Sequence, residues 1–253
     1  MKTVFRLMCL GVFCCASVVA DSRHAAGRAL PATVEIEASS KVSIQNGGFG
    51  SPVLSDDDSD EMDRTESVTT TLVSGTIVSA DGLIATNELG SLPPEAQLTV
   101  RLSDGRSLPG KVVVDDRRSK LQLVRIDAVD LPAIAIAQGE VAVGQSVVSV
   151  ATLDGYPGTV IDGIVSGVNR ARWEQWRAPL IQTNLQVGAG SSGSPVVNVR
   201  GELVGVVAAA AGGGPEERPS GTAFAVPAVM VREAIDAVKE DDIVTIQRGH
   251  LPS

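Results

Sequence analysis

Cysteine and histidine are both scarce in this sequence. The three cysteines, Cys9, Cys14 and Cys15, all lie in the first fifteen residues. Once a leader is removed, the chain would have no thiol, which excludes disulfides and cysteine metal sites. The only histidines are His24 and His250, one near each end. We expect both to be exposed tail residues, so neither is placed to serve a central site.

The first twenty residues have the pattern of a secretory signal peptide. Lys2 and Arg6 precede an apolar run from Leu7 to Val19, and a small residue, Ala20, stands before Asp21. We therefore predict export to the periplasm or the extracellular space. An uncleaved membrane anchor and a lipid-modified cysteine stay open as alternatives.

Basic residues are in the minority. Without the first twenty residues the chain keeps 19 basic and 30 acidic residues, a formal charge of −11. A surface of this sign argues against nucleic acid or anionic lipid as a partner, and we expect no membrane contact beyond the signal peptide.

Six acidic residues crowd between Asp56 and Asp63. A calcium-binding EF-hand loop starting at Asp56 would need glycine where Glu61 stands and a carboxylate where Ser67 stands. We therefore interpret this segment as a solvated acidic loop, and we expect no metal site and no cofactor.

Short β-rich runs, broken by turn signals about every ten residues, begin near Val68 and indicate an antiparallel sandwich or barrel. Asp81-Gly82 and Asp104-Gly105 supply the backbone freedom for tight turns. The first set of predicted strands covers residues 70–79, 82–86, 97–102, 106–114 and 121–126. The second set covers residues 145–151, 159–169, 180–184, 194–199, 202–210 and 222–226.

A stretch rich in Pro, Ala and Gly, from Leu131 to Gly144, separates the two sets, which predicts two similar β lobes joined by a linker. Apolar residues after Pro227 follow a 3.6-residue period and predict one closing helix. The chain is thus predicted to begin with a signal peptide (1–20). An N-terminal segment (21–67) follows, which holds a strand or hairpin (32–45) and the acidic loop. A domain over 68–240 and a tail (241–253) complete it. Within the domain, the lobes cover about 68–135 and 140–227, and the helix 228–240.

One segment has the residues of a nucleophilic serine loop. Gly190-Ser191-Ser192-Gly193-Ser194-Pro195 places serine among glycines on a tight loop between two predicted strands. A nucleophilic serine must be exposed, and nearby backbone N–H groups must converge on a developing oxyanion. Glycine allows the backbone angles that this convergence needs.

This segment resembles the Gly-Asn-Ser-Gly-Gly-Pro motif of HtrA/DegP-type serine proteases, with Ser192 at the nucleophile position. Further blocks similar to the family follow in family order, and the likeness covers roughly Val68 to Lys239. They are 75–87 (GTIVSADGLIATN), 102–106 (LSDGR), 163–166 (GIVS) and 223–227 (AFAVP). The resemblance implies an all-β, trypsin-like fold of two six-stranded antiparallel β-barrels with a C-terminal helix, and an oxyanion hole formed by the N–H groups of Gly190 and Ser192.

Two of the three catalytic residues that the resemblance implies are absent. The family's histidine follows Thr-Asn-x, but here Thr86-Asn87-Glu88 is followed by Leu89. The family's aspartate position holds Lys120. A serine hydroxyl is a poor nucleophile unless a base takes its proton, and Leu89 cannot do so. The sequence therefore predicts a catalytically inactive homologue that binds an extended peptide or a partner protein.

Two other functions stay open. In the first, Ser192 is active and Lys120, with a pKa lowered by burial, acts as its base; Glu88 is a weaker candidate because neighbouring strand side chains face opposite ways. In the second, the domain is an assembly unit, such as part of a homo-oligomer. The segment Arg170 to Arg177, which holds Trp173 and Trp176, is a candidate contact surface, although the two tryptophans could instead fold over the barrel end.

Overall fold

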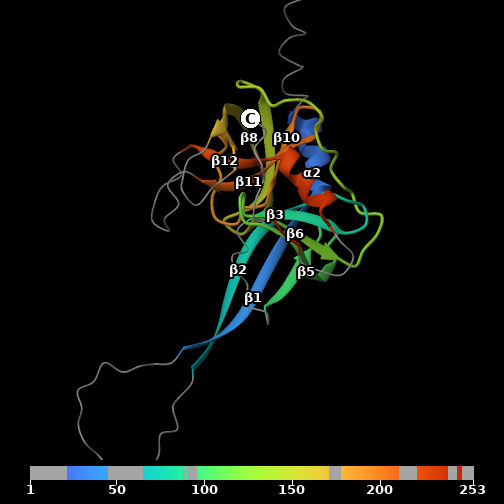
Figure 1. Cartoon of the computed structure of the whole chain (residues 1–253), viewed down its shortest axis with the longest axis vertical. Coiled ribbons are helices and arrows are strands. Elements are labelled where there is room, and N and C mark those ends of the chain that lie inside the picture. Colours follow the sequence, from blue (N-terminus) through green and yellow to red (C-terminus); the bar gives the residue numbers. More distant parts are fainter. Residues whose placement is uncertain are drawn as a thin grey trace, which may run out of the picture.

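The computed structural model describes residues 22–44, 65–87, 89, 96–170, 178–210, 221–238 and 244–246. These residues form two β-barrels joined by a linker (Figure 1). The predicted signal peptide, acidic loop, Trp173/Trp176 segment and His250 lie outside the described residues.

The first barrel closes through six antiparallel strands in the order β5-β4-β1-β2-β3-β6, with β6 pairing back to β5. The strands are β1 (Thr33–Ile44), β2 (Thr65–Ile77), β3 (Leu83–Asn87), β4 (Gln97–Arg101), β5 (Ser107–Asp116) and β6 (Leu121–Ile126). A short strand, β13 (Val244–Ile246), adds in parallel to the end of β5. Branched side chains such as Ile36, Ile84 and Val124 fill the interior and are fully buried.

The second barrel also closes through six antiparallel strands, in the order β10-β11-β12-β9-β8-β7. The strands are β7 (Ser146–Leu153), β8 (Tyr156–Arg170), β9 (Leu180–Thr183), β10 (Pro195–Asn198), β11 (Leu203–Ala210) and β12 (Ala223–Pro227). The predicted fold of two six-stranded barrels is confirmed. The expected turns also form, since Gly82 and Gly105 adopt φ of 99° and 89°.

The first strand is continuous where the sequence left a strand or a hairpin open. Residues 33–44 form a single strand, β1, which β2 pairs with from Thr33↔Thr76 to Ile44↔Thr65. Only Glu35 to Ser39 also pair with β4, so the far halves of β1 and β2 project from the barrel as a two-stranded ribbon (Figure 1). β1 is therefore a strand of the first barrel as well as the start of this ribbon.

Within the described ranges, two α-helices pack on the barrels. Helix α2 (Ala228–Asp236) starts where the apolar period predicted, and it buries Met230, Val231 and Ala234. Residues 22–29 form a second helix, followed by the 3-10 turn η1 (Leu30–Ala32), which the mixed composition of this stretch did not predict. Its buried face consists of alanines, including Ala25 and Ala29, whose small side chains give a weak hydrophobic signal.

Candidate functional site

The serine loop, residues 188–194, connects β9 to β10 and is braced by its own hydrogen bonds. The backbone N–H of Ser191 donates to Gly188 O (3.1 Å), and that of Ser194 donates to Ser191 O (3.0 Å). Ser191 Oγ accepts from the N–H of Gly188 (3.2 Å), and Ser191 is 1% exposed. Ser191 is therefore a structural residue of the loop, and Ser192 is the half-buried serine beside it.

Ser74, on β2 of the first barrel, clamps this loop of the second barrel. Its N–H donates to Ser192 O (2.9 Å), and its Oγ donates to Gly190 O (2.7 Å) while accepting from the N–H of Thr152 (2.9 Å). The Ser74 side chain is completely buried. Two of these hydrogen bonds hold the loop, at Gly190 and at Ser192 itself, and the third ties Ser74 to β7.

Replacing Ser74 with alanine removes both side-chain hydrogen bonds and leaves the N–H of Thr152 and the carbonyl of Gly190 buried without this partner. We expect a loss of about 1–3 kcal/mol in the free energy of unfolding, measured by urea denaturation. Ser74→Thr, which keeps the hydroxyl, should retain more of the stability. The control is Ser103→Ala, because Ser103 Oγ donates to Pro31 O (3.1 Å) at an exposed site. Equal losses at Ser74 and Ser103 would contradict the clamp.

Gly193 lies where no side chain fits. Its φ is 86°, and a Cβ atom there would overlap the carbonyl oxygen of Ser74. Its N–H donates to Val207 O (2.8 Å), and its carbonyl accepts from Thr76 Oγ1 (2.9 Å). Thr86 Oγ1 donates to Ser74 O (2.8 Å), so β2 and β3 both pack against the loop. The glycine that follows Ser192 is required for this contact between the barrels.

Leu89 follows β3 and is 3% exposed, within the main hydrophobic cluster. Thr86, three residues earlier, would touch a Cβ at Gly193, which places the end of β3 against the serine loop. The end of β3 that leads to Leu89 therefore lies beside that loop. Leu89 itself has an alkyl side chain, which can neither accept nor donate a proton.

Lys120 lies in the turn between β5 and β6, is half-buried and has a φ of 55°. Asn87 pairs with Leu121 across β3 and β6, and Asn87 Nδ2 donates to Ser119 O (3.0 Å). The structure thus brings the segments that carry Leu89 and Lys120 to the same end of the first barrel, as the two positions of a catalytic pair would require.

Sequence reasoning missed Asp116, the buried carboxylate of this turn. It accepts hydrogen bonds from Arg118 Nε (2.9 Å), Arg118 Nη2 (3.1 Å), the N–H of Arg118 (3.0 Å) and Ser119 Oγ (2.8 Å). These bonds raise the pKa of the Arg118 guanidinium. Because four donors occupy its two oxygens, Asp116 shapes the turn that carries Lys120 and is not arranged as an acid or base. The Asp-Arg-Arg-Ser sequence, typical of a polar turn, was the available signal.

Ser192 Oγ lies 3.4 Å from the carbonyl oxygen of Ala208, to which it donates a long hydrogen bond. An amide carbonyl cannot take a proton at neutral pH, so this contact does not activate the hydroxyl. The one described histidine, His24, is exposed on the N-terminal helix. Among the described residues, no cluster of three or more His, Cys, Asp or Glu is arranged to hold a metal ion.

Residues 73–206 match the model of the trypsin-like peptidase domain. The chain belongs to the trypsin-like peptidase family. Curated relatives show that this domain is of the HtrA/DegP type. A probable periplasmic serine endoprotease, DegP-like, from Hahella chejuensis is 34% identical over 182 residues, covering 70% of this chain and 37% of that protein. Its counterpart from Pseudomonas fluorescens is 38% identical over 136 residues, covering 53% and 28%.

Solved structures agree with this family. The HtrA-type protease AlgW with a decapeptide has a TM-score of 0.69 and 25% identity, covering 91% of this chain and 70% of that one. AlgW with a tripeptide has a TM-score of 0.67, covering 85% and 62%. The trypsin-like chain described here spans about a third of the length of the curated relatives it matches. In its described part, no helix is long and apolar enough to cross a membrane.

Proposed function

We propose that this protein is an exported HtrA-type protease homologue that has no proteolytic activity and binds an extended segment of another polypeptide at the serine loop. The observation that carries the proposal is Leu89, a buried alkyl side chain where the family has its general base. The periplasmic names of the relatives and the apolar leader support export.

The loss of activity follows from the chemistry of serine. Its hydroxyl attacks a carbonyl at a useful rate only when a base removes the proton during attack, and that base needs a partner to hold its tautomer. Losing a member of the triad costs about 10⁴- to 10⁶-fold in turnover, and losses within one unit are not additive. The Leu89 and Lys120 replacements together should therefore leave hydrolysis close to background.

Binding a peptide at the serine loop requires hydrogen-bond donors but no base, unlike hydrolysis. The serine loop remains clamped by Ser74 and Thr76, and the Gly190 and Ser192 N–H groups are the proposed donors to a peptide carbonyl. The HtrA-type protease AlgW was solved with a decapeptide, which supports a peptide as the ligand. Main-chain hydrogen bonds to a strand edge would supply affinity without a strict sequence requirement.

The second candidate is an active endopeptidase in which Lys120 serves Ser192 as base. The half-burial of Lys120 and its place at the same end of the barrel as Leu89 favour it. A fluorophosphonate separates the two candidates, because it reacts only with an activated serine. The inactive homologue should stay unlabelled, and labelling lost in Lys120→Met would support the active enzyme.

The binding proposal is tested with fluorescein-labelled, reduced and carboxymethylated α-lactalbumin, an unfolded chain. We expect the anisotropy of this unfolded chain to rise when the protein is added. The anisotropy of labelled native α-lactalbumin, the same chain in its folded form, should stay unchanged. Absence of binding to the unfolded chain, or equal binding to both ligands, would contradict the proposal.

A further inference from the structure

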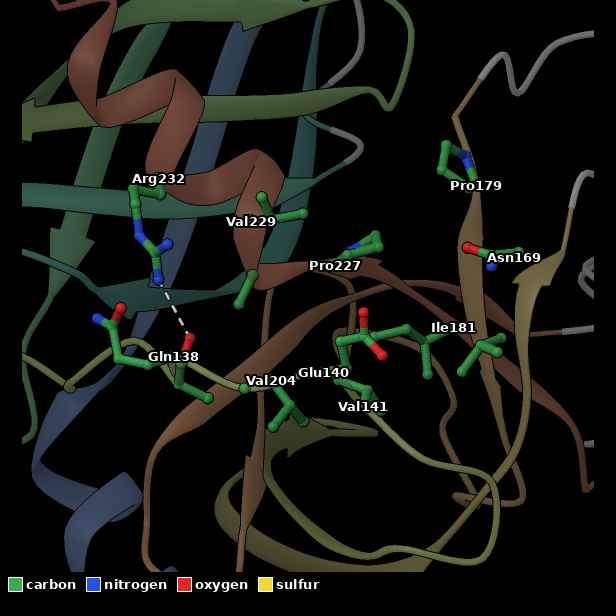
Figure 2. Close-up of a pocket in the computed structure, with 14 residues that line it drawn as sticks. Gln138, Glu140, Val141, Asn169, Pro179, Ile181, Val204, Pro227, Val229 and Arg232 are labelled. Atoms are coloured by element: carbon green, nitrogen blue, oxygen red, sulfur yellow. Dashed lines mark hydrogen bonds between the residues drawn. The ribbon is translucent and has the colours of Figure 1, made fainter. Parts of the chain in front are cut away.

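A pocket outside the serine loop lies where the linker between the barrels meets α2 and the second barrel. It has a volume of about 480 Å³ and is enclosed by the linker (residues 137–141), the facing ends of β8 and β9, and the first turn of α2 (Figure 2). None of the serine-loop residues lines it. Its volume is within the range of about 300–1,000 Å³ that ligand sites occupy.

The walls of this pocket, which we call the linker pocket, are mainly aliphatic. Val141, Ile181, Val204 and Val229 face it from four different segments. Val229 is 54% exposed although its neighbours on α2, Ala228 and Met230, are buried. Aliphatic side chains gathered around an open hollow are a typical anchor point for an apolar side chain of a ligand.

The two charged residues of the linker pocket have different roles. Arg232 Nη2 donates to the carbonyl of Ala137 (3.1 Å), so its guanidinium holds the linker against α2. Glu140 is exposed and forms no hydrogen bond or ion pair within the described part of the chain. In Figure 2 its carboxylate stands between Pro227 and Ile181, and Arg232 lies to its left. On this side of the pocket Glu140 is therefore a carboxylate with no charged partner among the described residues, whereas the Arg232 guanidinium is directed at the Ala137 carbonyl.

We propose that the linker pocket binds a peptide segment of a partner protein in which a large apolar residue stands beside an arginine or lysine. The apolar side chain packs on Val229 and Val141, above the buried Ile181 and Val204, and the cation pairs with Glu140. An exposed carboxylate on an aliphatic rim selects a partner by charge complementarity, while the apolar anchor supplies most of the binding energy. The site is independent of the serine loop and of the function proposed for it.

The test uses the purified protein, ¹⁵N-labelled, and the capped tripeptide Ac-Ala-Leu-Arg-NH₂. Its control is Ac-Ala-Leu-citrulline-NH₂, which has nearly the same shape without the charge. We expect the arginine peptide to shift the amide resonances of Glu140, Val204 and Val229 and to bind about fivefold more tightly than the citrulline peptide. Glu140→Gln should abolish this preference, and Val229→Gln should weaken the binding of both peptides.

Both substitutions are at exposed positions, so the variants should fold. Asp236→Asn and Val129→Gln are matched controls, because both residues are exposed and neither lines the pocket. Both should leave the binding of the two peptides unchanged. Equal affinity for the two peptides, shifts confined to other parts of the protein, or a charge preference that survives Glu140→Gln would overturn the proposal.

Discussion

The double substitution Leu89→His with Lys120→Asp should create a protease. It restores a base and its orienting carboxylate beside a serine loop that Ser74 and Thr76 already hold in place. Because loss of the triad costs about 10⁴- to 10⁶-fold, we expect casein cleavage to rise at least 10³-fold above the unmodified protein. Aspartate tolerates the left-handed backbone at position 120, where φ is 55°. Fluorescent peptide release from labelled casein measures the gain.

The controls for this gain are the single variants and a triple variant. Leu89→His alone should reach only a small part of the gain, because an imidazole without its carboxylate is poorly oriented. Adding Ser192→Ala must remove the activity. A folded double variant that stays inactive would contradict our view that the serine loop keeps a catalytic arrangement.

Gly193→Ala should be the most destabilising single substitution in the site. The new Cβ would overlap Ser74 O, a backbone atom that cannot move without disturbing the hydrogen bond from Ser74 N to Ser192 O. We expect a loss of more than about 3 kcal/mol in the free energy of unfolding, or no folded protein at all. Thermal denaturation followed by circular dichroism measures it.

Gly105→Ala is the matched control. Gly105 has almost the same φ, 89°, but nothing lies within 4 Å of a Cβ there. Gly105→Ala should lower the free energy of unfolding by only about 1–2 kcal/mol, which is what a side chain costs on left-handed backbone. If Gly193→Ala costs no more than Gly105→Ala, the steric account of the inter-barrel contact is wrong.

The two barrels could be predicted from the sequence because their strands are short, β-branched and separated by clear turn signals. Asp81-Gly82 and Asp104-Gly105 formed turns as expected. The helix over residues 22–29 could not be predicted, because its buried face is alanine and its position is set by contacts distant in sequence, such as that between Arg28 and Gly201. Tertiary packing, rather than local propensity, stabilises such a helix.

Some residues of the candidate site could be predicted from the sequence and others could not. Ser192, Gly190, Leu89 and Lys120 were found by motif, but the roles predicted for them stay predictions. Ser74 was not singled out, because a lone serine in a β-rich run carries no local signal of a contact with a loop more than a hundred residues away. The linker pocket could not be predicted for the same reason, since segments far apart in the chain line it.

The central claim is that this trypsin-like chain does not hydrolyse peptide bonds. The measurement that tests it most directly is cleavage of unfolded casein by the purified protein beside its Ser192→Ala variant, with fluorophosphonate labelling of both. We predict no cleavage above background and no labelling in either protein. Cleavage and labelling that disappear with Ser192 would contradict the claim and identify an active enzyme, with Lys120 as the first residue to examine as its base.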